Sequence, residues 1–179
     1  MSDIFSESEV KKIFSAINTR YPSNRRDLVM LKTMYYCGLR VSEVCKLTKD
    51  AVEDNQLLIF HSKCDKSRNV NAPEWLISEI RAVSDGHKGP LCFVSSTGKA
   101  IATCHLQHKL ARLADRLGIA RRKMHPHTFR HTYATRLVEA GMILPRVAKR
   151  LGHTEIKTTM VYVHLADTIS DAERELWSS

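Results

Sequence analysis

The pattern of apolar positions predicts a helix at the start of the chain. Apolar residues recur with helical spacing from Val10 to Ile17. Ser6 followed by Glu9 has the spacing of a capping box, which satisfies free backbone N–H groups at a helix N-terminus. Pro22 and Asn24 are expected to break this helix, because proline cannot supply the N–H that a helix interior needs.

The pattern then changes from helical to strand-like spacing. A second helix is expected from Leu28 to Gly38, where a glycine is a favourable C-terminal stop, and a short helix over residues 41–47. Residues 57–60 predict a strand and residues 68–72 a returning strand, so an antiparallel hairpin is expected. Pro73 starts a further helix that runs through Val83.

The second half of the chain predicts mostly helix, with glycines between the segments. The expected helices cover residues 103–117, 127–140, 144–151 and 155–163, followed by a possible helix over 167–177. There is no internal repeat, low-complexity stretch or linker. The predicted fold class is mainly α with one small antiparallel β-sheet, an α+β arrangement.

Composition limits the class of protein without identifying it. The 179 residues suit one domain, with 43% hydrophobic and 26% charged residues. No secretory signal or membrane span is apparent in the sequence. Five cysteines without a CxxC pair favour small buried side chains in a reducing cytoplasm over a disulfide framework or a zinc cluster.

The positive charge is concentrated in one segment. Residues 109–150 hold eleven lysines and arginines against two acids, so this segment carries all nine net positive charges of the chain. Such clustering indicates a surface for a polyanion, above all nucleic acid. An acidic protein and a membrane surface are the alternatives.

Residues 125–135, HPHTFRHTYAT, place cationic groups on one helix face. His127, Arg130 and His131 are spaced i, i+3, i+4, and Pro126 suits the first turn of the helix. An apolar stripe on another face would anchor the helix in the core: Phe129, Tyr133 and Leu137. Cations beside the free N–H groups of a helix N-terminus suit a phosphate. A surface helix with incidental histidines and a metal site are the alternatives, although no nearby acid or cysteine completes a ligand set.

Three further fragments gain meaning only in combination. In GLRVSE, residues 38–43, Arg40 follows a helix-ending glycine and can project into a cleft, and Glu43 is close enough to orient it. Downstream, Leu151-Gly152-His153 is followed nine residues after the histidine by Tyr162. A tyrosine near a C-terminus is by itself usually a packing residue.

In this order and spacing the fragments resemble the signature of the tyrosine recombinases, the phage integrase and Xer family. The matching fragments are residues 38–43, 127–131, 151–153 and 162–164, and the resemblance extends from about residue 5 to 165. The predicted hairpin also resembles the family's Gly-Lys-Gly-x-Lys-x-Arg turn over residues 62–68, with Ser62 and Cys64 in place of the two glycines.

The resemblance implies a site-specific recombinase or integrase with the tyrosine recombinase catalytic-domain fold. Tyr162 would attack a DNA phosphodiester, form a 3′-phosphotyrosine and release a 5′-hydroxyl. Because a phenol has an ordinary pKa of about 10, it must lose its proton during the attack. His127 would accept that proton or donate a hydrogen bond to the phosphate.

The remaining roles concern charge and the leaving group. Arg40 and Arg130 would clamp the non-bridging oxygens, a task that suits guanidinium forks. Lys63 would protonate the departing 5′ oxygen, His153 would donate a further hydrogen bond to the phosphate, and Glu43 would support Arg40. Because these cations stabilise the charge, the resemblance implies neither a metal nor any other cofactor, and no ATP.

The resemblance also implies partners and domain boundaries. The partner would be double-stranded DNA, bound by a homotetramer, with no membrane or small-molecule substrate. The expected DNA-contacting cations are Arg121, Arg122, Lys123, Arg146, Lys149 and Arg150. Residues 1–165 would be the catalytic domain, residues 166–179 a tail that packs in cis or in trans, and the family's N-terminal core-binding domain is expected to be absent.

Alternative functions of the same fold remain open at this point. One is a catalytically silent DNA-binding module, and another is relaxation of DNA in the manner of a type IB topoisomerase. A metal-dependent nuclease would need a carboxylate cluster that the sequence lacks. Neither the DNA target nor the biological task (integration, chromosome-dimer resolution or cassette recombination) can be read from the residues.

Overall fold

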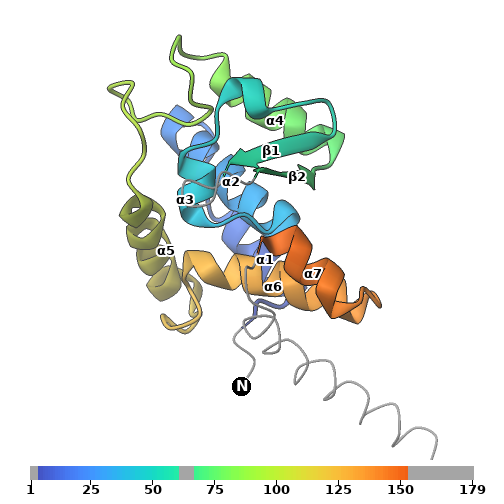
Figure 1. Cartoon of the computed structure of the whole chain (residues 1–179). Helices are drawn as coiled ribbons and strands as arrows, with labels where there is room; N and C mark the ends of the chain where they lie inside the picture. The colour runs from blue at the N-terminus through green and yellow to red at the C-terminus, as the bar shows by residue number, and fades with distance from the viewer. Residues whose placement is uncertain (1–3, 61–66, 153–179) are drawn as a thin grey trace, which may run out of the picture.

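The computed structural model describes residues 4–60 and 67–152 and is mostly helical (Figure 1). Its α-helices are α1 (Glu7–Ser15), α2 (Pro22–Cys37), α3 (Val41–Cys45), α4 (Glu74–Ser84), α5 (Thr103–Leu117), α6 (Pro126–Glu139) and α7 (Leu144–Leu151). A 3-10 helix covers Lys49–Ala51, and the strands are β1 (Gln56–Phe60) and β2 (Ser67–Asn71). The strands pair antiparallel, with Leu58 opposite Asn69. The predicted fold class is confirmed for the described residues.

Helix α2 is the central element of the molecule, and α3, α4 and α6 pack around it (Figure 1). Most of its side chains are buried, from Arg26 to Cys37, because neighbours cover it on several sides. The expectation that Pro22 breaks the first helix is wrong, because α1 already ends at Ser15. Pro22 occupies the first turn of α2, where the missing N–H costs nothing.

The residues just before α1 cap that helix and pack against the beginning of α6. The predicted capping box is confirmed: Glu9 N donates to Ser6 Oγ at 3.2 Å, and Ser6 N donates to Glu9 Oε2 at 2.7 Å. The Phe5 ring packs against Phe129 of α6 with centroids 4.8 Å apart. The predicted burial of Phe129 is therefore confirmed, and this contact fixes the N-terminal half of α6 against the main core.

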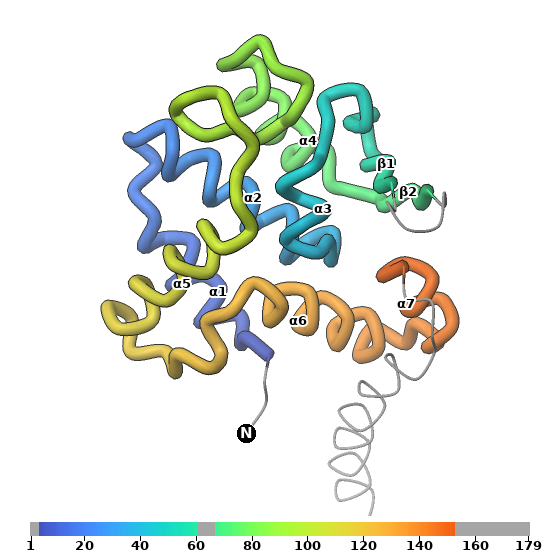
Figure 2. Tube along the Cα trace, turned by 60° about the vertical axis from the view of Figure 1, so that its left-hand side comes forward, coloured from blue at the N-terminus to red at the C-terminus, as the bar shows by residue number. Residues whose placement is uncertain are grey.

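A second, small apolar cluster fixes α7 on α6. Ala134 of α6 packs with Val147 and Leu151 of α7, and Tyr133 and Leu137 lie against them. The views agree that α7 lies close to the β1–β2 hairpin (Figures 1 and 2). The C-terminal end of α7 is thus held between α6 and the hairpin.

Several predicted boundaries coincide with the structure. The helices over 103–117 and 144–151 have the predicted limits, and the hairpin strands differ from prediction by one residue. The predicted helices over 155–163 and 167–177 lie outside the described residues. Among the described cysteines, Cys37, Cys45 and Cys92 are buried as expected, whereas Cys104 is exposed. Within the same described part of the chain, no helix is long and apolar enough to cross a membrane.

Candidate functional site

The end of α2 places Arg40 at the entrance of a polar cluster. Gly38 ends the helix with φ of 64°, a left-handed conformation that glycine adopts without steric cost. A side chain at this position would also collide with the ring of Tyr133 on α6. The close approach of α2 and α6 therefore requires glycine, and the chain then turns so that Arg40 is the N-cap residue of α3.

Glu43 is the buried acceptor at the centre of this cluster. Its side chain is 7% exposed, and Oε2 accepts from the backbone N–H of Arg40 at 2.7 Å while Oε1 accepts from Arg40 Nη1 at 3.1 Å. Arg68 Nη1 and Nη2 donate to the two carboxylate oxygens at 2.9 and 3.0 Å. Burial by itself raises the pKa of Glu43, but the bonds and charge of Arg68, with Arg40 and Arg130, outweigh burial and lower it. Glu43 is therefore ionised at neutral pH.

Arg130 lies deeper than Arg40 and faces the same carboxylate. Its side chain is 5% exposed, and Nη1 lies 3.9 Å from Glu43 Oε2. Nη1 also donates to the carbonyl of Gly38 and Nη2 to the carbonyl of Leu151, each at 2.5 Å. The structure thus brings together Arg40, Glu43 and Arg130, three of the residues that the sequence analysis selected.

The cluster also caps the C-terminal end of α7. The carbonyls of a last helical turn lack partners within the helix and carry partial negative charge, so cations stabilise them. Three consecutive carbonyls receive arginines from three elements: Arg68 Nε donates to Arg150 at 3.1 Å, Arg130 Nη2 to Leu151, and Arg40 Nη2 to Gly152 at 3.3 Å. The next residue in the chain is His153.

Arg40 keeps part of its guanidinium toward solvent. Its side chain is 32% exposed, much more than those of Arg130 and Glu43. Among residues 4–60 and 67–152, its Nε has no hydrogen-bond partner. A guanidinium has five N–H donors, so Arg40 can bind an anion while it keeps Glu43.

His127 stands at the N-terminal end of α6, close to both arginines. His125 caps this helix, because its Nδ1 accepts from the His127 N–H at 3.3 Å, and the two rings stack 5.5 Å apart. Desolvation first, then the charges of His125, His131, Arg130 and Arg40, lower the pKa of His127. The ring is therefore mainly neutral at pH 7 and can accept a proton.

The other three residues for which the sequence analysis predicted a catalytic role lie outside the described residues: Lys63, His153 and Tyr162. Two of them stand next to described segments in the sequence. The segment that holds Lys63 joins Phe60 of β1 to Ser67 of β2, and His153 follows Gly152 directly.

The six predicted DNA-contacting cations fall into two groups. Arg121 and Arg122 are exposed beyond α5, and Arg121 forms a salt bridge with Asp115 at 2.6 Å. Lys123 instead donates to Glu9 at 2.6 Å, with its side chain 18% exposed and its ammonium over the Phe5 ring. This geometry favours a role for Lys123 in fixing α1 over a contact with DNA.

The second group surrounds a cavity of about 700 Å³ between β2 and α7. Its lining residues are Ser67, Arg68, Asn69, Met142, Arg146, Lys149 and Arg150. Arg146 and Lys149 are exposed, whereas Arg150 is half-buried. The cavity is therefore strongly cationic and lies beside the capped end of α7.

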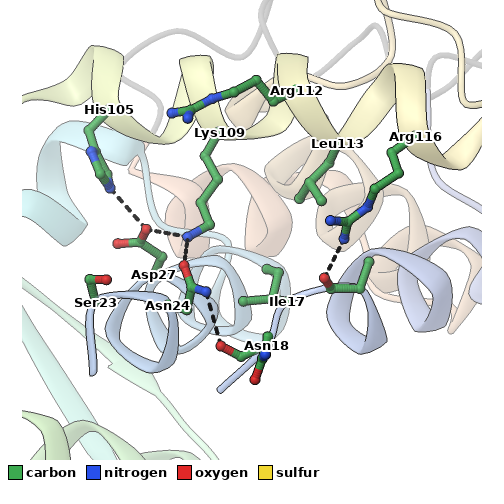
Figure 3. A pocket seen from close by; sticks show the side chains of 11 residues that line it. Ile17, Asn18, Ser23, Asn24, Asp27, His105, Lys109, Arg112, Leu113 and Arg116 are labelled. Carbon is green, nitrogen blue, oxygen red and sulfur yellow. Dashed lines mark hydrogen bonds and ion pairs between the residues drawn. The ribbon is translucent and has the colours of Figure 1, made fainter. Parts of the chain in front are cut away.

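A different polar cluster, which sequence reasoning missed, lies between α2 and α5 (Figure 3). Asp27 is buried and accepts from Arg26 Nη2 at 2.6 Å, Lys109 Nζ at 2.7 Å and His105 Nε2 at 2.9 Å. It lies against a cavity of about 400 Å³ whose cations are tied to protein acceptors, as Lys109 is to Asn24 Oδ1. The Asp27 cluster joins two helices, and none of its residues belongs to the fragments that carry the family resemblance.

Sequence reasoning also missed the part that Arg68 plays. It is the last residue of the predicted turn motif, so a signal existed, but the sequence alone did not indicate that it contacts Glu43. Among the described residues, no group of three His, Cys, Asp or Glu side chains is arranged to hold a metal ion.

Comparisons with known proteins agree on one family. The sequence model of the Phage integrase family matches residues 4–168. A tyrosine recombinase XerD of Proteus mirabilis is 34% identical over 170 residues, which cover 90% of this chain and 54% of that protein. The chain likewise spans little more than half the length of other curated relatives that it matches.

Solved structures share the fold. A crystal structure of XerA recombinase superposes with a TM-score of 0.81 and 26% identity, covering 99% of this chain and 65% of that one. A post-cleavage complex of XerH site-specific recombinase with palindromic difH substrate has a TM-score of 0.81 and 23% identity, covering 98% of this chain and 53% of that one. At that lower identity the second likeness concerns the fold.

Proposed function

This chain belongs to the phage integrase family, and from that premise we propose that it is the catalytic part of a site-specific tyrosine recombinase. Its substrate would be double-stranded DNA, which it would cleave and rejoin through a 3′-phosphotyrosine at Tyr162. The observation that supports this most directly is the pair Arg40 and Arg130 around Glu43, at the helix end that leads into His153.

The arginine pair suits a phosphodiester that is gaining charge. In the pentacoordinate transition state the non-bridging oxygens carry more negative charge than in the ground state, and fixed guanidinium groups stabilise that increase. Glu43 and the α7 carbonyls hold both arginines before DNA arrives, so little reorganisation is needed. The role of Glu43 is then support, because its oxygens already accept from Arg40 and Arg68.

Cleavage would exchange a DNA phosphodiester for a phosphotyrosine ester, with one proton accepted and one donated by the protein. The new ester would retain the energy needed for rejoining. The Tyr162 oxygen attacks phosphorus as its proton passes to neutral His127, and the bond to the 5′ oxygen breaks as Lys63 gives that oxygen a proton. His153 would donate a hydrogen bond to the phosphate. Rejoining reverses these steps, because a 5′-hydroxyl attacks the phosphotyrosine, so the reaction would use neither a metal ion nor ATP.

The DNA would be bound by the basic surface around this site. Arg121 and Arg122 on one side and Arg146, Lys149 and Arg150 on the other would contact phosphates and position the duplex. We further propose that residues 1–165 form the catalytic domain and that residues 166–179 form a tail. The protein would act as a homotetramer on DNA in the cytoplasm.

Covalent capture tests the proposal directly. The full chain would be incubated in EDTA with a pool of nicked suicide duplexes whose central segment is randomised, and adducts would be separated on a denaturing gel. We expect an adduct that is absent in Tyr162→Phe, and sequencing the captured DNA would reveal the preferred site. Binding without any adduct would support a silent module instead, and cleavage that requires Mg²⁺ and persists in Tyr162→Phe would overturn the proposal.

Relaxation of a supercoiled plasmid distinguishes the topoisomerase-like alternative. A recombinase should join the cut strand to a partner duplex that carries the captured site. Relaxation without such joining would favour the topoisomerase-like reading.

A further inference from the structure

Arg68 is a largely covered arginine, and each of its three nitrogens donates to a protein acceptor beside the site. It is the second residue of β2, and its side chain is 11% exposed. Nη1 and Nη2 form a fork on the two oxygens of Glu43, and Nε donates to the carbonyl of Arg150. A fork of this kind fixes both the distance and the plane of a carboxylate.

This geometry makes Arg68 the link between three elements. Through Glu43 it reaches α3, which Arg40 precedes as the N-cap residue, and through the Arg150 carbonyl it reaches the last turn of α7. The next two carbonyls, those of Leu151 and Gly152, accept from Arg130 and Arg40. Arg68 therefore acts on the same two anchors, the carboxylate and the helix end, that hold the proposed catalytic arginines.

The charge balance of the cluster depends on Arg68 as well. Three guanidinium groups surround one carboxylate, so two positive charges remain uncompensated within the group formed by Arg40, Glu43, Arg68 and Arg130. Without Arg68, Glu43 would neutralise one of the two remaining arginines. A carboxylate left with fewer donors would also draw Arg40 and Arg130 toward itself and away from a phosphate.

We propose that Arg68 is a positioning residue for the strand-cleavage reaction: it holds Glu43 and the end of α7 so that Arg40 and Arg130 remain available to the scissile phosphate. The inference rests on the proposed function, since it assumes that these two arginines bind that phosphate. Arg68 itself makes no contact with DNA in this proposal, because its donors are directed at protein acceptors.

The first measurement separates positioning from binding. Arg68→Lys keeps the charge but cannot form the fork, and Arg68→Gln removes the charge. With the duplex captured by the unchanged protein, we expect cleavage to slow about ten- to a hundredfold in Arg68→Lys and more in Arg68→Gln, because small displacements of positioning groups have effects of this size. The Kd for the same duplex should stay within about twofold, and its salt dependence should not change.

Arg26→Lys is the matched control. Arg26 also donates to a buried carboxylate with two of its nitrogens, but it does so at Asp27, away from the site. This variant should lose stability and still cleave at the normal rate at a temperature where it is folded. If Arg26→Lys slowed cleavage as much as Arg68→Lys, loss of stability would explain both effects and the proposal would be wrong.

A double-mutant cycle with Glu43→Gln tests the route of the effect. If Arg68 acts through Glu43, the effects of the two substitutions should not add, because coupled residues are not additive. The double variant should then cleave at most about twofold more slowly than Glu43→Gln alone. Additive slowing would contradict the route. In parallel, the arginine Nε–Hε resonances of Arg40 and Arg130 should shift in Arg68→Lys, whereas that of Arg26 should not.

The outcomes distinguish this inference from the function on which it rests. A normal cleavage rate in both Arg68 variants would overturn the positioning role and leave the recombinase proposal intact. A Kd weakened in proportion to the rate, with a reduced salt slope, would make Arg68 a DNA contact and would also overturn it. Failure of the unchanged protein to form a Tyr162-dependent adduct would overturn both proposals.

Discussion

Two buried carboxylates, Asp27 and Glu43, are surrounded by cations in similar ways but leave those cations in different situations. At Asp27 the donors come from α2 and α5, and Arg26 is completed by the carbonyl of Val94 at 2.8 Å. At Glu43 the donors come from α3, β2 and α6, and Arg40 remains one third exposed. The arginine and lysine at Asp27 are therefore largely covered, whereas at Glu43 one arginine keeps part of its guanidinium toward solvent.

The difference lies in what else the cations contact. The Asp27 cluster ties side chains of neighbouring helices, so its contribution is to packing. The Glu43 cluster ties arginines to consecutive carbonyls at the end of α7, just before His153. A count of buried ion pairs would not distinguish the two clusters. The backbone carbonyls that the arginines of the Glu43 cluster contact at the end of α7 do distinguish them.

The largest expected effect is the loss of cleavage in Arg130→Lys. A lysine ammonium can face Glu43 but cannot reach the carbonyls of Gly38 and Leu151 and a phosphate together, as a guanidinium fork can. Adduct formation should fall by about a hundredfold or more, the size expected when one donor to a developing charge is lost. Single-turnover capture on the suicide duplex measures this, and a rate within about threefold of normal would show that Arg130 has no such role.

Asp27→Asn should affect stability instead. It leaves Arg26 and Lys109 without the buried charge that they face, and breaking such a group typically costs about 3 kcal/mol or more of unfolding free energy. Urea unfolding measures the loss, and adduct formation at a temperature where the variant is folded should be normal. Slower cleavage by the folded variant would mean that the two clusters are not independent.

Acid should lower the stability that each cluster provides, because it protonates the central carboxylate, Asp27 in one cluster and Glu43 in the other. Burial alone would raise the pKa of Asp27, but hydrogen bonds from Lys109, His105 and Arg26 outweigh it and lower the pKa below the ordinary 3.8. A carboxylate whose pKa is lower in the folded than in the unfolded protein stabilises the fold above the unfolded pKa, and this stability is lost as pH falls through the folded pKa. The unfolding free energy should therefore decline below about pH 4. Asp27→Asn should flatten that decline, and an unchanged slope would contradict the assignment.

Gly38→Ala should cost more than Gly118→Ala, although both glycines end helices with nearly the same φ, 64° and 65°. Alanine in this conformation costs about 1 kcal/mol at either position. At Gly118 nothing lies near the added carbon, whereas at Gly38 the Tyr133 ring must move. Thermal or urea unfolding compares the two, and equal losses would mean that α6 yields easily at this contact.

Much of the fold could be predicted because its signals are local. The capping box at Ser6, the glycine stops and the helical spacing over 103–117 and 144–151 each depend on a few neighbouring residues. Pro22 was the instructive error: it was predicted to break the first helix, which ends earlier at Ser15, and it instead occupies the first turn of α2, where proline is favourable. The 3-10 turn Lys49–Ala51 carries no comparable pattern and was not predicted.

The site was predictable only as far as its motifs extend. Arg40, Glu43 and Arg130 were selected from fragments some ninety residues apart, and the structure brings them to one carboxylate. The role of Arg68 depends on the carbonyl and the carboxylate that it meets across the fold, and the role of Asp27 depends on the cations that it meets, and no local pattern encodes either. Lys63, His153 and Tyr162 remain predictions, because they lie outside the described residues.

The smallest expected effect is a shift in the titration of His127. Its pKa lies below the ordinary 6.5, first because the ring is desolvated and next because His125 and other cations lie near it. The unfolded chain then binds the proton more readily, so this group lowers stability as pH falls through 6.5. It also keeps His127 neutral at pH 7, as a proton acceptor for Tyr162 must be.

Replacing His125 with glutamine should sharpen this point. The change removes one nearby positive charge at low pH, so the pKa of His127 should rise toward the ordinary 6.5, as followed by NMR titration of its ring proton. His87→Gln is the control, because His87 lies near Cys92, away from α6, and should leave the titration of His127 unchanged. As the pH is lowered, the second-order rate constant for covalent capture of DNA should then begin to fall at a slightly higher pH in His125→Gln than in the unchanged protein. This rate constant reports the titration of groups in the free protein. A His127 titration that moves while the capture profile stays fixed would show that another group accepts the proton.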